Sequence, residues 1–235
     1  MRARILLSSE AHIGAVDDWR RALVSARDTL LLIFLIWATL QGFGNPASSG
    51  HMLTAMAVGI ALFFGVSTGR ATRLQVQYFS DELERERSEI RDHFEHECEE
   101  VRELYAAKGF HGSLLDQVVD TITSDDDRLL KVMMEEELGL LVHHVTHPLL
   151  VGVWNFTASV LVGLLLALPT VWLSASASRV WVPACGALVL AVISLIAARA
   201  ARRGFVEFFA AGSMMAVATG GVAYFLAQWL SELGP

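Results

Sequence analysis

Apolar and polar positions divide this chain into two kinds of segment. Five runs are long and apolar enough to cross a bilayer as helices, which takes about 20 residues. They cover residues 24–43, 51–69, 149–173, 180–198 and 205–230. The stretch 70–148, between the second and third runs, is rich in charged side chains. The pattern therefore predicts an all-α integral membrane protein with five transmembrane helices and a three-helix insert between spans 2 and 3.

The insert begins as a continuation of the second span. Residues 75–91 are mostly charged, as expected for a helix that leaves the bilayer as a solvated stalk. Asp92 and Glu95 then have the three-residue spacing of an N-cap and its acidic partner. This spacing predicts a new helix that begins there and ends near Lys108, before Gly109.

Two further helical pieces complete the insert. Residues 113–122 are amphipathic, and Ser124 with Asp127 repeats the capping spacing before a last helix that runs toward the third span. The expected divisions of the chain are an N-terminal segment at 1–23, spans 1 and 2 at 24–69, the insert at 70–148, spans 3 to 5 at 149–230, and a tail at 231–235.

Arginines mark one side of the predicted membrane segments. They precede the first span, follow the second and join the fourth to the fifth, at Arg20, Arg21, Arg27, Arg70, Arg73, Arg199, Arg202 and Arg203. Arg179 is the exception. By the positive-inside rule the N-terminus and the insert are cytoplasmic and the C-terminus lies outside. Residues 1–27 lack the apolar core of a cleavable signal. These features favour a bacterial inner membrane, with a vacuolar membrane as the alternative.

Composition supports a membrane protein rather than a soluble one. The chain is 54% hydrophobic and 18% charged, with a mean hydropathy of +0.46. Its net charge of −7 arises mainly in the insert. Cys98 and Cys185 fall in different kinds of segment, which argues against a disulfide framework.

Seven side chains of the insert have the chemistry of metal ligands. They are Glu86, Glu89, Glu97, Glu100, Met133, Met134 and Glu137. Spacings of three or four residues bring neighbours in this set to one face of a helix. Carboxylates alone suit magnesium, calcium or manganese, whereas thioether sulfur shifts the preference toward softer first-row ions. The set predicts a site for ferrous iron, with manganese, cobalt or zinc as alternatives.

A single straight helix cannot bring this set together. Glu86 and Glu100 would then lie on the order of 20 Å apart. The chain must fold back near residues 90–92, or a second subunit must supply its own copy. The alternative interpretation is a solvated acidic face supported by Glu–Arg pairs, with a Met pair that fills the core.

Several short motifs of the insert form a recognisable series. They are Arg85-Glu86-Arg87 with Glu89, then Glu97, Glu100, Leu104-Tyr105 and Gly109-Phe110, and finally Met133-Met134 with Glu137-Leu138-Gly139. This series resembles the cytoplasmic metal-binding domain of the vacuolar iron transporter family, and the layout agrees from Asp28 to the fifth span. The resemblance implies export of ferrous iron and manganese from the cytoplasm in exchange for protons. It also implies a homodimer in which ions gather at those seven ligand positions before entering a path between the subunits.

The membrane spans depart from that family's pattern. Its first span begins Asn-Asp-Gly, where this chain has Arg27-Asp28-Thr29. Its second span carries Ser-Met-Ala and then Gly-Glu, where this chain has Phe63-Phe64-Gly65 and then Ser67-Thr68. Phe64 and Thr68 thus stand where the thioether and carboxylate of the transport path are expected. Candidate substitutes, each of which can equally be a packing residue, are Met52, Met56, Asn155, Met214 and Met215.

Asp28 is the acid that remains at the start of the first span. One interpretation makes it the entry ligand of the ion and a group that exchanges protons. The other is structural: Asp28 pairs with Arg27 or Arg21, or caps the first helix.

Three histidines precede Pro148 at the predicted membrane boundary. His143 and His147 are four residues apart and flank His144, a spacing that can hold zinc or iron. They can equally be polar residues that end a helix at the interface before a proline.

The sequence therefore predicts a proton-linked exporter of ferrous iron or manganese. No nucleotide loop or nucleophile with its base is visible, so we expect neither an enzyme nor a resident cofactor. The acidic insert has the wrong sign for nucleic acid. The alternatives are a membrane-anchored metal-binding or sensing protein that has lost the transport path, and a transporter of another substrate.

Overall fold

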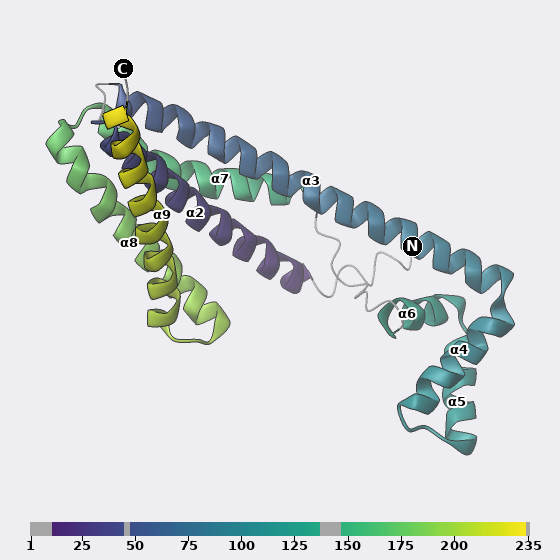
Figure 1. The fold of residues 1–235 in the computed structure, drawn as a ribbon. Coiled ribbons are helices and arrows are strands. Elements are labelled where there is room, and N and C mark those ends of the chain that lie inside the picture. The colour runs from purple at the N-terminus through teal and green to yellow at the C-terminus, as the bar shows by residue number, and fades with distance from the viewer. Residues whose placement is uncertain (1–10, 45–47, 137–146, 234–235) are drawn as a thin grey trace. The chain divides into compact units, whose positions relative to one another are not determined.

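The computed structural model describes residues 11–44, 48–136 and 147–233, and the side chains from Trp19 onward within these ranges. The described chain is α-helical apart from its short connections (Figure 1). Its elements are α2 (Ala11–Gly42), α3 (Ser49–Asp92), α4 (Phe94–Ala107), α5 (Gly112–Thr123), α6 (Asp126–Glu136), α7 (Pro148–Ala167), the 3₁₀ helix η1 (Leu168–Val171), α8 (Ala175–Ala201) and α9 (Phe205–Leu233). The predicted all-α class is confirmed.

Within the residues that the structure describes, five helical segments are long and apolar enough to cross a membrane, as predicted. They are Trp19–Gly42, Ser49–Asp92, Pro148–Val171, Ala175–Ala201 and Phe205–Leu233. Several extend beyond the apolar runs, because backbone hydrogen bonding carries a helix into its polar flanks until a cap or turn ends it. The clearest case is α3, one helix of 44 residues that contains the second span and the predicted stalk.

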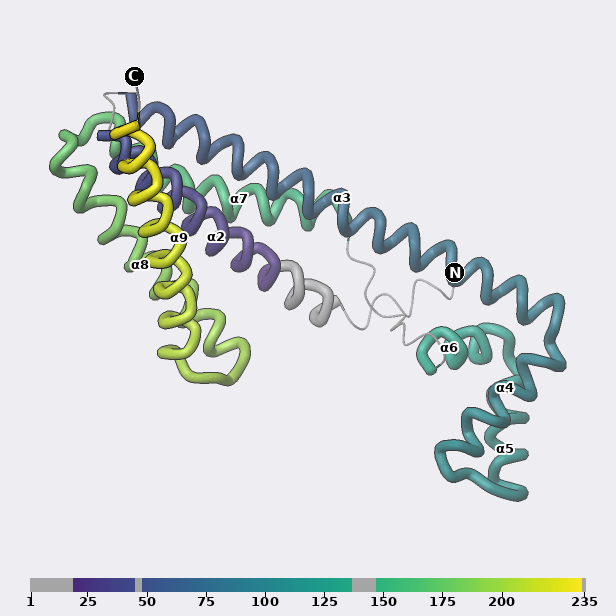
Figure 2. The backbone as a smooth tube through the Cα atoms, in the orientation of Figure 1, coloured from purple at the N-terminus to yellow at the C-terminus, as the bar shows by residue number. Residues whose placement is uncertain are grey.

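Internal contacts divide the structure into two compact units. We name the first the insert unit; it is centred on residues 72–136 and contains α4, α5, α6 and the later part of α3. The second, the membrane unit, contains α2, the first part of α3, α7, α8 and α9. The smooth trace in Figure 2 follows α3 without a break from one unit into the other.

The membrane unit has small residues where its helices meet. A Cβ on Gly65 of α3 would lie 2.8 Å from Cβ of Phe156 on α7. One on Gly152 of α7 would lie 2.8 Å from the Gly65 carbonyl oxygen. Membrane helices associate by such close approach because lipid gives them no hydrophobic driving force. Large side chains point outward instead: Trp172, Val206 and Val217 are 76%, 74% and 71% exposed, as expected for contact with lipid.

The insert unit has its own hydrophobic core, formed by side chains from all four of its helices. The buried members are Ile90, Val101, Leu115, Val119, Ile122, Leu129, Leu130, Met133 and Met134. Ion pairs at the rim join α4 to α5 (Arg102–Asp116, 2.5 Å), α3 to α6 (Arg87–Asp127, 3.8 Å) and α4 to α6 (Lys108–Glu136). The hydrogen bond with Asp116 raises the pKa of Arg102, so its guanidinium stays charged. Such exposed pairs contribute little energy, and the core holds the unit together.

The helix breaks lie near their predicted positions, but both predicted caps are wrong. Asp92 is the last residue of α3, and His93 precedes α4 without a side-chain capping bond. At α6 the cap is Asp125, whose Oδ1 accepts a hydrogen bond from the Arg128 amide at 3.0 Å. Ser124, predicted for that role, instead donates to the Thr121 carbonyl. At each break the predicted cap has a polar neighbour that takes its place, His93 after Asp92 and Asp125 after Ser124. The three-residue spacing could not distinguish the predicted cap from this neighbour.

Candidate functional site

Two of the predicted metal ligands lie inside the core of the insert unit. Met133 and Met134 on α6 are 1% and 0% exposed. They pack in one cluster with Ile90 of α3 and Val101 of α4. Their sulfur atoms are therefore shielded from bulk water, and both side chains fill space between helices that come from distant parts of the sequence.

Two predicted carboxylates are buried beside the same core. Glu86 on α3 and Glu97 on α4 are each 4% exposed. Each lies one helical turn before a core residue, Ile90 and Val101 respectively, so its side chain projects from the helix face that meets the other helices. A carboxylate in this position needs a cation or hydrogen-bond donors to offset its loss of hydration. The structure thus places two acids and two thioethers on inward-facing sides of one small unit.

The other predicted ligands do not share this environment. Glu89 is exposed and lies 4.0 Å from Arg85, and Glu100 is partly exposed and lies 3.3 Å from His96 Nε2. Glu137 lies outside the described residues. Among the residues that the structure describes, no three His, Cys, Asp or Glu side chains are close enough together to hold a metal. A metal centre built on Glu86 and Glu97 therefore needs the thioethers, Glu137 or a second copy.

A third buried acid was missed at the level of sequence. Glu82 is 7% exposed and lies one turn before Glu86 on α3, where the Arg85 guanidinium pairs with it. The four-residue spacing of Glu82, Glu86 and Ile90 was visible in the sequence and marks one helix face. Glu82 therefore adds a second carboxylate, one helical turn away, to the electrostatic environment of Glu86.

Cys98 on α4 is the one thiol of the insert unit. Burial raises its pKa, the nearby carboxylates of Glu95 and Glu97 raise it further, and a hydrogen bond with Thr123 opposes the shift. The thiol therefore stays protonated near neutral pH. A metal that bound this sulfur would first have to displace its proton.

Asp28 of α2 forms an ion pair with its neighbour. Arg27 donates to Asp28 Oδ1 through Nε at 3.0 Å and through Nη2 at 2.8 Å, and both side chains remain partly exposed. The pairing foreseen in the structural interpretation of Asp28 is thus present. It leaves the second carboxylate oxygen, Oδ2, outside that ion pair.

The proposed substitutes for the missing path ligands lie in contrasting places. Met52, Met56, Met214 and Met215 are 43%, 45%, 73% and 54% exposed on the outside of the membrane unit. Asn155 of α7 is fully buried, and its Oδ1 accepts a hydrogen bond from Ser25 of α2 at 2.5 Å. Its Nδ2 donates to the Val151 carbonyl at 2.7 Å. Asn155 is therefore a polar link between two spans.

Comparison with known proteins identifies the family of this chain. The family model described as the VIT family matches residues 19–230, which takes in all five spans and the insert. The chain belongs to the VIT family. The expected resemblance to vacuolar iron transporters is confirmed, and with it the expectation that this protein is not an enzyme.

Curated VIT relatives match part of the chain. Vacuolar iron transporter 1 of Tulipa gesneriana is 30% identical over 135 residues, which is 56% of this chain and 53% of that protein. Vacuolar iron transporter 1 of Arabidopsis thaliana is 31% identical over 136 residues, and vacuolar iron transporter 2 of Oryza sativa subsp. japonica is 29% identical over 145. The chain spans about half the length of the curated relatives it matches.

In the second span of this VIT protein, Phe64 and Thr68 occupy the positions where the family's ligands are expected. Thr68 donates its hydroxyl to the Phe64 carbonyl at 2.5 Å, one turn back along α3. The Phe64 ring packs edge-on against Phe63. Neither side chain supplies a carboxylate or a thioether, so the departure seen in the sequence persists in the structure.

Of the three histidines before Pro148, His143 and His144 lie outside the described residues. His147 precedes α7 as its N-cap residue and makes no side-chain capping bond. Its ring is exposed. Nothing in this position singles out a metal site.

Proposed function

We propose that this VIT protein exports ferrous iron, manganese or both from the cytoplasm in exchange for protons. The observation that carries the proposal is the insert unit, where Glu86, Glu97 and the Met133-Met134 pair lie on inward-facing sides of three helices. Membership of the VIT family over residues 19–230 supplies the class of cargo. In this proposal the N-terminus and insert are cytoplasmic, the C-terminus lies outside, and the protein works as a homodimer.

The insert would collect ions before they enter the membrane unit. Buried carboxylates supply charge that a divalent cation neutralises, and thioether sulfur favours ferrous iron over magnesium or calcium. Glu89, Glu100 and Glu137 complete the proposed set. Glu89, which is exposed, and Glu100, which is partly exposed, would accept ions from water. Cobalt and zinc are ions that the same donors would also accept.

Asp28 is proposed as the first ligand inside the membrane unit. It lies beside the arginine-rich end of α2 and is partly exposed. An arriving cation would compete with the Arg27 guanidinium for its carboxylate, and a proton can occupy the same oxygen once the cation has moved on. Cation and proton would thus use one residue in turn.

A second candidate function rests on the second span. Because Thr68 is bonded to its own helix and Phe64 offers only a ring, the expected path ligands are absent from α3. A protein that kept the insert and lost the path would be a membrane-anchored metal-binding or sensing protein. That function predicts metal binding without transport.

Uptake of ferrous iron or manganese into proteoliposomes, with and without a pH gradient, separates the two functions. The exporter should move metal faster with a gradient, and Asp28→Asn should lower that rate about tenfold or more while keeping the shape of the side chain. Glu232→Gln, at an exposed carboxylate near the end of α9, is the matched control and should leave the rate unchanged. Parental transport by Asp28→Asn would make Asp28 structural. Metal binding without any transport would establish the sensor.

A further inference from the structure

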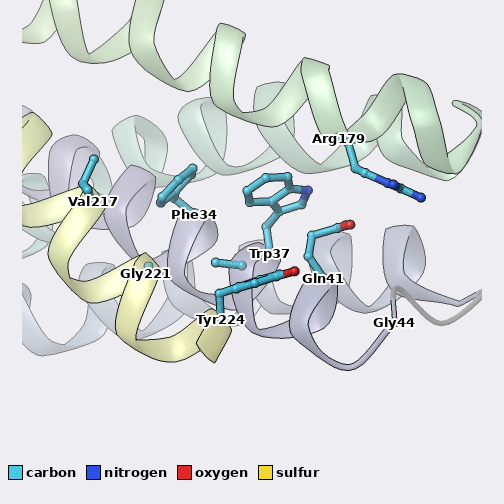
Figure 3. Close-up of a pocket in the computed structure, with 10 residues that line it drawn as sticks. Phe34, Trp37, Gln41, Gly44, Arg179, Val217, Gly221 and Tyr224 are labelled. Carbon is cyan, nitrogen blue, oxygen red and sulfur yellow. The ribbon is translucent and has the colours of Figure 1, made fainter. Parts of the chain in front are cut away.

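The membrane unit contains a cavity of about 640 Å³ among α2, α8 and α9 (Figure 3). Its lining changes character along the helices. Phe34 and Val217 make one end apolar, whereas Gln41 and Arg179 lie toward the other end, with the ring of Trp37 between them (Figure 3). Small-molecule sites in proteins measure about 300–1,000 Å³. The cavity therefore has the size for one small amphipathic molecule.

The cavity is open space that can be reached from the bilayer. A Cβ on Gly221 of α9 would meet no heavy atom within 4 Å, whereas one on the neighbouring Gly220 would lie 2.7 Å from Phe34 Cε1. Val217 and Tyr224 line the cavity and are nevertheless 71% and 37% exposed. Because both side chains belong to a spanning helix, the cavity opens sideways toward lipid.

Arg179, near the start of α8, is the one charged residue of the described lining. Its side chain makes no ion pair or hydrogen bond with any residue that the structure describes. The acid nearest to the cavity along α9 is Glu232, which is not part of the lining and lies eight residues beyond Tyr224, about 12 Å along the helix. The lining therefore carries one positive charge that no carboxylate within it offsets.

Arg179 is also the arginine that departs from the positive-inside pattern. The other segments predicted on its side of the membrane, residues 44–50 and 231–235, contain no lysine or arginine, and neither do residues 174–178 just before it. The pattern by itself gives no reason for a cation at this position. An anionic group held in the cavity would supply that reason.

We propose that this cavity binds one long-chain fatty acid, with its carboxylate at Arg179 and its hydrocarbon chain running past Trp37 toward Phe34. A guanidinium matches a carboxylate with two parallel hydrogen bonds, and the Gln41 amide is a further donor at the same end. One cation that is not offset corresponds to a head group with one negative charge. The apolar end provides packing contacts for the chain.

Other occupants match the lining less well. A quaternary ammonium ion is attracted to aromatic faces such as those of Phe34, Trp37 and Tyr224, but Arg179 would repel it. A small soluble anion would leave the apolar end uncovered. In a two-fold interface centred on the cavity the same patch would face itself, so two copies of Arg179 would approach each other.

The test is native mass measurement of the full chain in mild detergent, together with its melting temperature. The probes are oleate, its uncharged methyl ester, acetate, which has the charge without the chain, and oleylamine, which has the opposite charge. Oleate should remain bound, one molecule to each chain, and should raise the melting temperature, whereas the other three should do neither. Equal retention of the methyl ester, equal protection by acetate, or retention of oleylamine or phosphatidylglycerol in place of oleate would overturn the proposal.

A substitution at the polar end tests the role of charge. Arg179→Gln should weaken the retention of oleate about tenfold or more, because it removes a charge-assisted pair of hydrogen bonds. Arg199→Gln is the matched control, at an exposed arginine in the last turn of the same helix and outside the lining, and it should leave retention unchanged. Parental retention in Arg179→Gln would refute the proposed head-group site.

A substitution at Gly221 tests the cavity itself and keeps Arg179. Gly221→Leu should fill the space and expel oleate while the fold persists, since the added Cβ meets no other atom within 4 Å. Gly59→Leu is the matched control, because a Cβ on Gly59 of α3 also meets nothing and Gly59 does not line the cavity. Parental retention in Gly221→Leu, or a change of oligomeric state in place of lost oleate, would refute the proposal.

Discussion

At the scale of single residues, the Met133-Met134 pair has one observed role, packing in the core, and one proposed role, binding metal. A substitution can separate the two. Replacing both by leucine keeps volume and apolarity, so each change should cost less than about 1.5 kcal/mol in stability. Calorimetry should show several-fold weaker binding of ferrous iron or cobalt and little change for magnesium or calcium. Leu129→Met, in the same buried cluster, is the matched control and should not alter ion binding. Unchanged affinity for all ions would make the pair core residues only.

Asn155 is a fully buried polar residue of the membrane unit. Its amide bridges α7 to Ser25 of α2, and such interhelical bonds within membranes contribute about 1 kcal/mol. Asn155→Leu should lower the free energy of unfolding in detergent by about that amount. Thr157→Val is the control, because the Thr157 hydroxyl bonds only within its own helix, to the Val153 carbonyl at 2.8 Å. A variant of normal stability that no longer transports metal would instead place Asn155 on the ion path.

At the scale of elements, the contact between α3 and α7 depends on glycine. A methyl group on Gly65 meets Phe156 Cβ at 2.8 Å, too close for the helices to keep their positions, whereas one on Gly59 of the same helix meets nothing within 4 Å. Gly65→Ala should therefore lower the melting temperature. Gly59→Ala should be neutral or stabilising, since alanine favours a helix by about 1 kcal/mol over glycine. Equal effects of the two changes would contradict this account of the contact.

At the scale of the whole molecule, we predict a homodimer that bound metal stabilises. The insert unit concentrates acid within a chain of net charge −7, and cations held between two copies would offset that repulsion. Native mass measurement in mild detergent with ferrous iron or manganese should give twice the chain mass of 25.7 kDa. Chelation should increase proteolysis of the insert, and Glu86→Gln with Glu97→Gln should reduce this sensitivity to metal. A monomer in the presence of metal would refute the prediction.

The sequence by itself determined the layout of this protein. Apolar runs long enough to span a bilayer predict helices because an unsatisfied backbone is too costly in lipid. Gly109 adopts a φ of +95° just after α4, so the end of that helix was also readable from the chain. The motifs around Glu86 and Met133 indicated the family before any contact was known. These features are local, and local sequence is sufficient to specify them.

Tertiary structure decided which side chains share an environment. Positions three apart on a helix differ by about 60° in direction, so spacing could not tell that Glu86 faces the core while Glu89 faces water. The partner of Asn155 lies 130 residues away, at Ser25. A cavity among α2, α8 and α9 depends on three helices whose arrangement in space the hydrophobic pattern does not contain. Burial and long-range contact depend on how helices pack, and packing depends on the whole chain at once.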